Sequence, residues 1–143
     1  VLSPLPGLLR EQTESMKKNG WNPVQVHARF INEMRRARQA GVLLIFGTDC
    51  GSEIMVHGQQ YKALYGETQM GSSPMEALLM ATRDAAKALG KEKELGTVEP
   101  NKMADLVILE ADPLADMRNL GKVNAVMKAG KLYKPAEVIS RQK

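Results

Sequence analysis

Apolar residues recur with helical spacing in two stretches of the chain. Over residues 23–40 they return every three or four positions, and Gly41 follows directly. A broader apolar stripe covers residues 74–89, and Gly90 comes next. Each stretch begins with proline, which suits the first helical turn because its missing N–H would have no partner there. The pattern therefore predicts helices over 23–40 and 74–89, each ended by its glycine.

Local signals refine the helices. Ser73 precedes the second stretch and Glu76 follows three residues later, the spacing of a capping box in which each side chain bonds the other residue's amide. Weaker periodicity predicts two short helices, over about 8–18 and 59–65.

A different pattern follows the first long helix. Val42–Phe46 is a run of five apolar residues, which favours a strand covered on both faces, as in a parallel sheet. The polar loop Gly47–Gly51 follows this strand. A helix, a strand and a polar loop form one α/β repeat.

The last third of the chain predicts short β-strands. The expected strands and breaks, in order, are a strand at Ala104–Leu109, a break at Asp112-Pro113, a strand at Val123–Met127, and a turn at Ala129–Lys131 that leads into Leu132-Tyr133. The chain therefore divides into an α/β part over residues 1–94 and a β part over residues 95–143.

Composition and charge exclude some classes of protein. Hydrophobic residues make up 43% and charged residues 25%, which is typical of a globular chain. The net charge of +4 comes from residues 1–40, where no aromatic residue is interleaved with Arg35, Arg36 and Arg38. A solvated helix face explains these charges, so we expect no nucleic-acid partner.

No apolar run approaches the roughly 20 residues of a membrane helix, so we expect no membrane partner. The chain opens on Val1 without an initiator Met, so we expect the true N-terminus to be missing. The lack of a signal peptide is then uninformative, and a cytoplasmic location is only the default expectation.

The sequence offers few ligands for a metal ion. Cys50 is the single cysteine, and the two histidines, His27 and His57, lie 30 positions apart. Zinc prefers three or four good ligands. We therefore expect no metal to bind to this chain alone.

Five segments, in one order, resemble the amidohydrolase superfamily, in particular the imidazolonepropionase-like group that includes prolidase-like peptidases. The segments are Gly41–Asp49, Ser73–Gly90, Leu95–Val107, Asp112–Leu114 and Val126–Lys131. Each segment is weak evidence by itself, but the shared order and spacing point to a shared fold.

The resemblance implies a (β/α)8 barrel with a small β-sandwich. Residues 1–94 would be the C-terminal fragment of the barrel, with its last strand and helices, and residues 95–143 would be strands of the sandwich. It also implies that a hydroxide, held by zinc or another divalent metal in the complete enzyme, attacks a small amide, cyclic amide or dipeptide substrate. The ligand histidines of the family lie on earlier strands, which this sequence does not contain.

The resemblance makes Asp49 the candidate catalytic and metal-contacting residue, since barrel active sites lie at the C-terminal ends of the strands. A carboxylate there can take a proton from bound water and pass it to the leaving nitrogen. The alternative is a turn residue that bonds its own backbone. His57 is a candidate for substrate binding, or else a surface or packing histidine. His27 and Cys50 are interpreted as packing residues, because His27 lies on an apolar stripe and no group activates Cys50.

A second hypothesis belongs to another class, a non-catalytic α/β module that acts by association. One barrel strand and a few sandwich strands cannot close their sheets, so we expect the chain to self-associate. An upstream reading frame that contains a His-x-His segment after a first strand would favour the enzyme.

Overall fold

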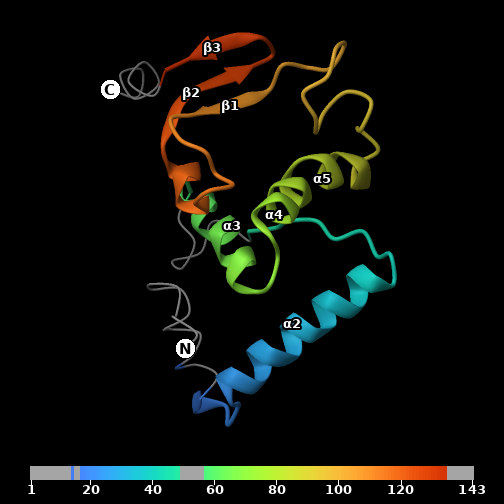
Figure 1. The fold of residues 1–143 in the computed structure, drawn as a ribbon, viewed down its shortest axis with the longest axis vertical. Coiled ribbons are helices and arrows are strands. Elements are labelled where there is room, and N and C mark those ends of the chain that lie inside the picture. The colour runs from blue at the N-terminus through green and yellow to red at the C-terminus, as the bar shows by residue number, and fades with distance from the viewer. Residues whose placement is uncertain (1–13, 15–16, 49–56, 135–143) are drawn as a thin grey trace.

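The computed structural model describes residue 14 and residues 17–48 and 57–134. In the described part of the chain, helices come first and the strands come last (Figure 1). The elements are α2 (Pro23–Gln39), α3 (Gln60–Gln69), α4 (Pro74–Ala81), α5 (Arg83–Ala88), β1 (Leu106–Leu109), the 3-10 helix η1 (Met117–Gly121), β2 (Val123–Lys128) and β3 (Lys131–Tyr133). The predicted helix over 8–18 lies almost wholly outside the described residues.

Helix α2 begins at the predicted residue and ends one residue before the predicted end. The Asn22 side chain accepts a hydrogen bond from the Val24 amide at 3.0 Å, and Pro23 occupies the first turn. Gly41 then takes a φ of +74°, a conformation that glycine adopts without a steric penalty. The chain leaves the helix at this point.

The capping box at the start of α4 is confirmed. The Glu76 amide donates to Ser73 Oγ at 3.2 Å, and the Ser73 amide donates to Glu76 Oε2 at 2.7 Å. The single helix predicted over 74–89 is wrong at one residue, because Thr82 (φ −126°, ψ −89°) separates α4 from α5. Its hydroxyl donates to the Leu78 carbonyl at 2.7 Å, a side-chain bond that is known to bend helices.

Helix α3 begins one residue after the predicted start and continues four residues beyond the predicted end. It packs against both α4 and η1. The 3-10 helix was not predicted. The Asp116 side chain caps it by accepting a hydrogen bond from the Arg118 amide at 2.9 Å. The periodicity of apolar residues does not predict a local bond of this kind.

The three predicted strands form one antiparallel sheet in the order β1-β2-β3. Val107 lies opposite Val126, which in turn lies opposite Tyr133. The predicted turn between β2 and β3 has two residues with positive φ, Ala129 at +48° and Gly130 at +80°, as tight hairpins require.

The strand predicted over Val42–Phe46 is wrong for the described residues, where this stretch has no regular secondary structure. Val42, Leu43 and Ile45 are exposed instead of covered. The physical reason is that a strand exists only beside a hydrogen-bonded neighbour, and no described segment lies in register with this one. The barrel to which it was assigned is therefore not seen here.

Among the described residues, the buried apolar ones are few, and they lie on α4, α5, η1 and β2: Ala77, Met80, Ala86, Met117 and Ala125. Figure 1 shows α3, α4 and α5 between the long helix α2 and the sheet. In this middle layer, α3 packs against α4 and η1, and α4 packs against α5. Within the described ranges, every helix is too short or too polar to cross a membrane.

Candidate functional site

Of the two predicted site residues, the structure describes His57 but not Asp49. Asp49, the candidate catalytic and metal-contacting residue, lies outside the described residues, as does Cys50. His57 is exposed and lies in the turn just before α3, where Gly58 has a φ of +87°. His27 lies in α2, and its side chain is not among those described. The structure therefore leaves the role of Asp49 untested.

The chain that leads into the Asp49 loop is held between two helices. At its start, the Val42 amide donates to the Ala37 carbonyl of α2 at 3.0 Å. Near its end, the Phe46 amide donates to the Met80 carbonyl of α4 at 3.2 Å. Since Met80 is 4% exposed, this bond fixes the segment to a buried position of α4.

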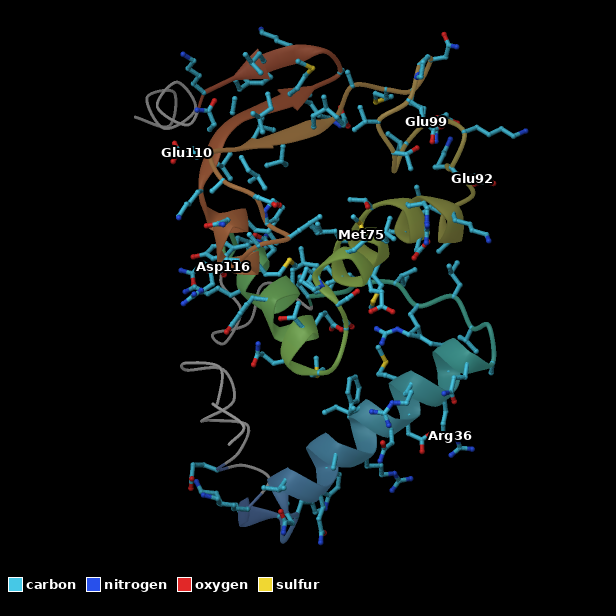
Figure 2. The ribbon with its side chains drawn as sticks, viewed as in Figure 1. Arg36, Met75, Glu92, Glu99, Glu110 and Asp116 are labelled. Carbon is cyan, nitrogen blue, oxygen red and sulfur yellow. The ribbon has the colours of Figure 1, made fainter. Side chains whose placement is uncertain are left out.

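A polar cluster joins α2 to the start of α4. Arg38 donates to the Ser72 hydroxyl at 2.5 Å, and its guanidinium lies 3.9 Å from the Glu76 carboxylate. The Arg38 side chain is 25% exposed and Ser72 is buried, so this hydrogen bond is largely shielded from water, whereas the Glu76 side chain is 47% exposed and its contact with Arg38 is open to solvent. Arg36, by contrast, lies on the side of α2 that faces away from the other helices (Figure 2).

Glu67 of α3 adds a second acid to this cluster. One of its carboxylate oxygens is buried without a hydrogen-bond partner among the described residues. Burial raises the pKa of the Glu67 carboxyl above its ordinary value, and the positive charge of Arg38 lowers it by a smaller amount. The opposite holds for Glu76, whose pKa is lowered, first by the hydrogen bond from the Ser73 amide.

Sequence reasoning did not find this cluster. One signal was present, because Arg38 occupies a position where the apolar stripe of its helix would continue. An arginine on an apolar stripe indicates a buried partner, since a guanidinium is seldom buried unpaired. Nothing in the sequence indicated which acid lies near it.

A shallow cavity of about 290 Å³ lies between α3, the start of α4 and residues 114–118. Tyr65 and Thr68 line one side, and Asp116 and Arg118 line the other. The two charged groups neutralise each other through an ion pair of 2.7 Å. His57 is not among the lining residues, so the cavity does not correspond to the predicted site.

Within residues 17–48 and 57–134, no three side chains of His, Cys, Asp or Glu come together as metal ligands would. The described residues therefore do not fit a divalent metal by themselves. Each of the acids in the Arg38 cluster is committed to an arginine or to an amide hydrogen bond, or is buried alone.

Comparison with known proteins identifies the class. A model of the amidohydrolase family matches residues 8–133, which is most of the chain and includes the loop that carries Asp49. The chain therefore belongs to the amidohydrolase family.

Two curated relatives match part of the chain. The chain is 37% identical over 87 residues to a 5-methylthioadenosine/S-adenosylhomocysteine deaminase of Symbiobacterium thermophilum, covering 54% of this chain and 20% of the relative. It is 36% identical over 105 residues to an imidazolonepropionase of Geobacillus kaustophilus, covering 70% of this chain and 24% of the relative.

The structural comparison agrees. A crystal structure of a Xaa-Pro dipeptidase with bound methionine in the active site is 33% identical, with a TM-score of 0.66 over 78% of this chain and 26% of the dipeptidase. The expected likeness to imidazolonepropionases and prolidases is thus confirmed. The chain spans about a quarter or less of the length of these relatives.

Proposed function

We propose that this chain is the C-terminal part of a metal-dependent hydrolase of C–N bonds, and that it contributes Asp49 to the active site. The observation that carries the proposal is the family match over residues 8–133, which spans the Asp49 loop. The names of the relatives support amides, cyclic amides or dipeptides as the substrate class, since they include an imidazolonepropionase and a Xaa-Pro dipeptidase.

The proposed role of Asp49 is proton transfer. Its carboxylate would accept the proton of the attacking water and then donate it to the leaving nitrogen, so that neither a hydroxide nor an amide anion has to be released into water. In the proposed barrel, the loop that carries Asp49 would lie at the end where the active sites of such barrels are found and would open on the substrate. The hydrogen bond from the Phe46 amide to the Met80 carbonyl supports this placement, because it fixes the residue directly before the loop Gly47–Gly51.

A divalent metal such as zinc would polarise the substrate and the water in the complete enzyme. The described part of this chain offers no cluster of ligands for it. We therefore propose that the ligands, apart from a contact with Asp49, come from the three quarters of the relatives that this chain does not match. His57, which follows Asp49 by eight positions in the sequence, is proposed to line the substrate pocket.

The test is Asp49→Asn in the longest protein that contains this chain and has hydrolase activity. Asparagine keeps the size and one acceptor oxygen, so the loop keeps its shape, but it cannot carry the proton. We expect kcat to fall by about a hundred- to ten-thousand-fold, with an unchanged unfolding temperature.

The matched control is Asp112→Asn. Asp112 is a carboxylate of the β part that accepts from the Leu114 amide at 2.8 Å, and its loss should leave kcat unchanged. A near-normal kcat in Asp49→Asn would remove Asp49 from the mechanism.

The 143-residue chain gives a second test. It should hydrolyse neither imidazolonepropionate nor dipeptides, and elemental analysis should find far less than one zinc per chain. A tightly bound zinc in equal amount would contradict the assignment of the ligands to another part of the protein.

A further inference from the structure

Arg38 lies near the end of α2, and its guanidinium reaches across to α4. Its Nη2 donates to the Ser72 hydroxyl, just before α4 begins, and to the Met80 sulfur at 3.8 Å, in the last turn of α4. Its Nε lies 3.9 Å from the Glu76 carboxylate. Since Glu76 and Met80 are four positions apart, they lie on one face of α4. A single side chain therefore joins the end of α2 to α4 along this face.

The same two helices hold the chain that follows α2. The Val42 amide donates to the Ala37 carbonyl of α2, and the Phe46 amide donates to the Met80 carbonyl of α4. Met80 is thus bound twice, through its sulfur by Arg38 and through its carbonyl by Phe46. Figure 1 shows this chain turning back from the end of α2 along α4. The place of Phe46 consequently depends on how α2 and α4 lie against each other.

Arg38 also acts on α3. Burial raises the pKa of the Glu67 carboxyl of α3, and the positive charge of Arg38 opposes that rise. The Ser72 amide donates to the Glu67 carbonyl at 3.1 Å, so the hydroxyl partner of Arg38 is itself bound to α3. In the sequence, α2 comes before the loop that carries Asp49 and α3 comes after it. Arg38 therefore connects the helices that precede and follow this loop.

An arginine suits this place because its guanidinium presents several donors in one plane and can serve several acceptors at once. Arg36 provides the contrast on the same helix. It lies 3.4 Å from the carboxylate of Glu33, one turn earlier in α2, and Figure 2 shows it pointing away from the other helices. The two arginines are thus a matched pair, of which only Arg38 joins α2 to α4.

We propose that Arg38 is a positioning residue for the hydrolytic reaction: by joining α2 to α4 it sets the place of residues 42–48, and so of the Asp49 carboxylate relative to the substrate. This inference rests on the role proposed above for Asp49. Arg38 lies eleven positions before Asp49 and acts through the backbone, without touching the substrate. A carboxylate that takes and returns a proton must lie within hydrogen-bond reach, and a displacement of about 1 Å can cost about a hundred-fold in rate.

The test is a double-variant cycle in the longest protein that contains this chain and has hydrolase activity. Arg38→Met keeps an apolar stem but removes every donor, and it should lower kcat by about ten- to a hundred-fold, with KM unchanged within about twofold. In the Asp49→Asn background the same change should cost less than about twofold, because a carboxylate that is already absent cannot be displaced. Arg36→Met should leave kcat unchanged in both backgrounds.

The outcomes separate this inference from the proposed function. If Asp49→Asn has a normal kcat, the proposed role of Asp49 fails, and the inference fails with it. If Asp49→Asn is impaired but Arg38→Met has a normal kcat, only the inference is overturned. It is also overturned if Arg38→Met lowers kcat by the same factor in both backgrounds, because Arg38 then does not act through Asp49.

Ser72→Ala decides the matter if Arg38→Met does not fold. This change removes the hydroxyl that accepts from Arg38 and leaves the contact with Glu76 in place. It should lower kcat by a smaller factor than Arg38→Met, and only while Asp49 is present. A Ser72→Ala variant with a normal kcat, in a protein whose Asp49→Asn variant is impaired, would refute the positioning role.

Discussion

Gly96 is the position at which the structure makes its sharpest prediction about stability. Its φ is +93°, and it lies where the link to the sheet passes the break between α4 and α5. A β-carbon there would meet the Ala86 β-carbon at 2.6 Å, the Thr82 carbonyl oxygen at 3.0 Å and the Arg83 α-carbon at 3.1 Å. Two of these atoms are backbone, so they cannot turn aside. Gly96→Ala should therefore strain the backbone and force the link away from α5.

The magnitude follows from two contributions. A residue with a β-carbon in the left-handed region costs about 1–2 kcal/mol, and overpacking a filled site costs about 1–3 kcal/mol. Gly96→Ala should lower the free energy of unfolding by about 2–5 kcal/mol, a large share of the roughly 5–15 kcal/mol that holds a typical domain together. At about 3 °C per kcal/mol for a chain of this size, the unfolding temperature should fall by about 6–15 °C.

The assay is thermal unfolding of Gly96→Ala beside Gly130→Ala. Gly130 has a similar φ of +80° but open space around it, so its variant should show only the backbone contribution. Ala86→Gly in the Gly96→Ala background should restore part of the loss, because it removes the shortest of the three contacts. A Gly96→Ala variant no less stable than Gly130→Ala, with no rescue, would show that the close approach at Gly96 is not present in the protein.

Three further predictions concern polar groups. Ser73→Ala should lower the free energy of unfolding by about 1 kcal/mol, whereas Ser73→Thr should retain most of the stability that the cap provides. If a denaturant titration shows equal losses for the two variants, Ser73 does not act as a cap. Burial raises the pKa of Glu67 above its ordinary 4.5, so the folded chain holds this proton to higher pH than the unfolded chain, and stability falls as the pH rises from 4.5 through the raised pKa. Glu67→Gln should therefore be more stable than the unmodified chain at pH 7 and nearly equal below pH 4; a variant less stable at pH 7 would contradict this. The Asp105 pKa is lowered, first by the bond from the Ala129 amide, so Asp105→Asn should loosen the β2–β3 turn and speed hydrogen exchange at Ala129, whereas unchanged exchange would show that the bond is not formed.

The family could be predicted from the sequence because the motifs that identify it are short and local. The capping box of Ser73 and Glu76 sets its own conformation through hydrogen bonds between near neighbours, and the turn at Ala129–Gly130 is marked by a glycine that tolerates a positive φ; the structure reproduces both. The order of such stretches along the chain predicts the amidohydrolase family, and the family match confirms it. The role of Asp49 stays a prediction.

The tertiary structure decided what depends on distant partners. The pattern of Val42–Phe46 predicts a strand, but strand pairing needs a neighbour that this part of the chain does not supply, so the stretch has no regular secondary structure. The break at Thr82 depends on contacts that no helical periodicity records, with Gly96 lying against its carbonyl. Likewise, the position of Arg38 on an apolar stripe indicated only that its guanidinium has a buried partner. The fold determines that this partner is Ser72, which lies 34 positions further along the chain. Local hydrogen bonds depend on residues that are close in the sequence, so they can be predicted from it. Packing between distant segments depends on the folded arrangement of the whole chain, so it cannot.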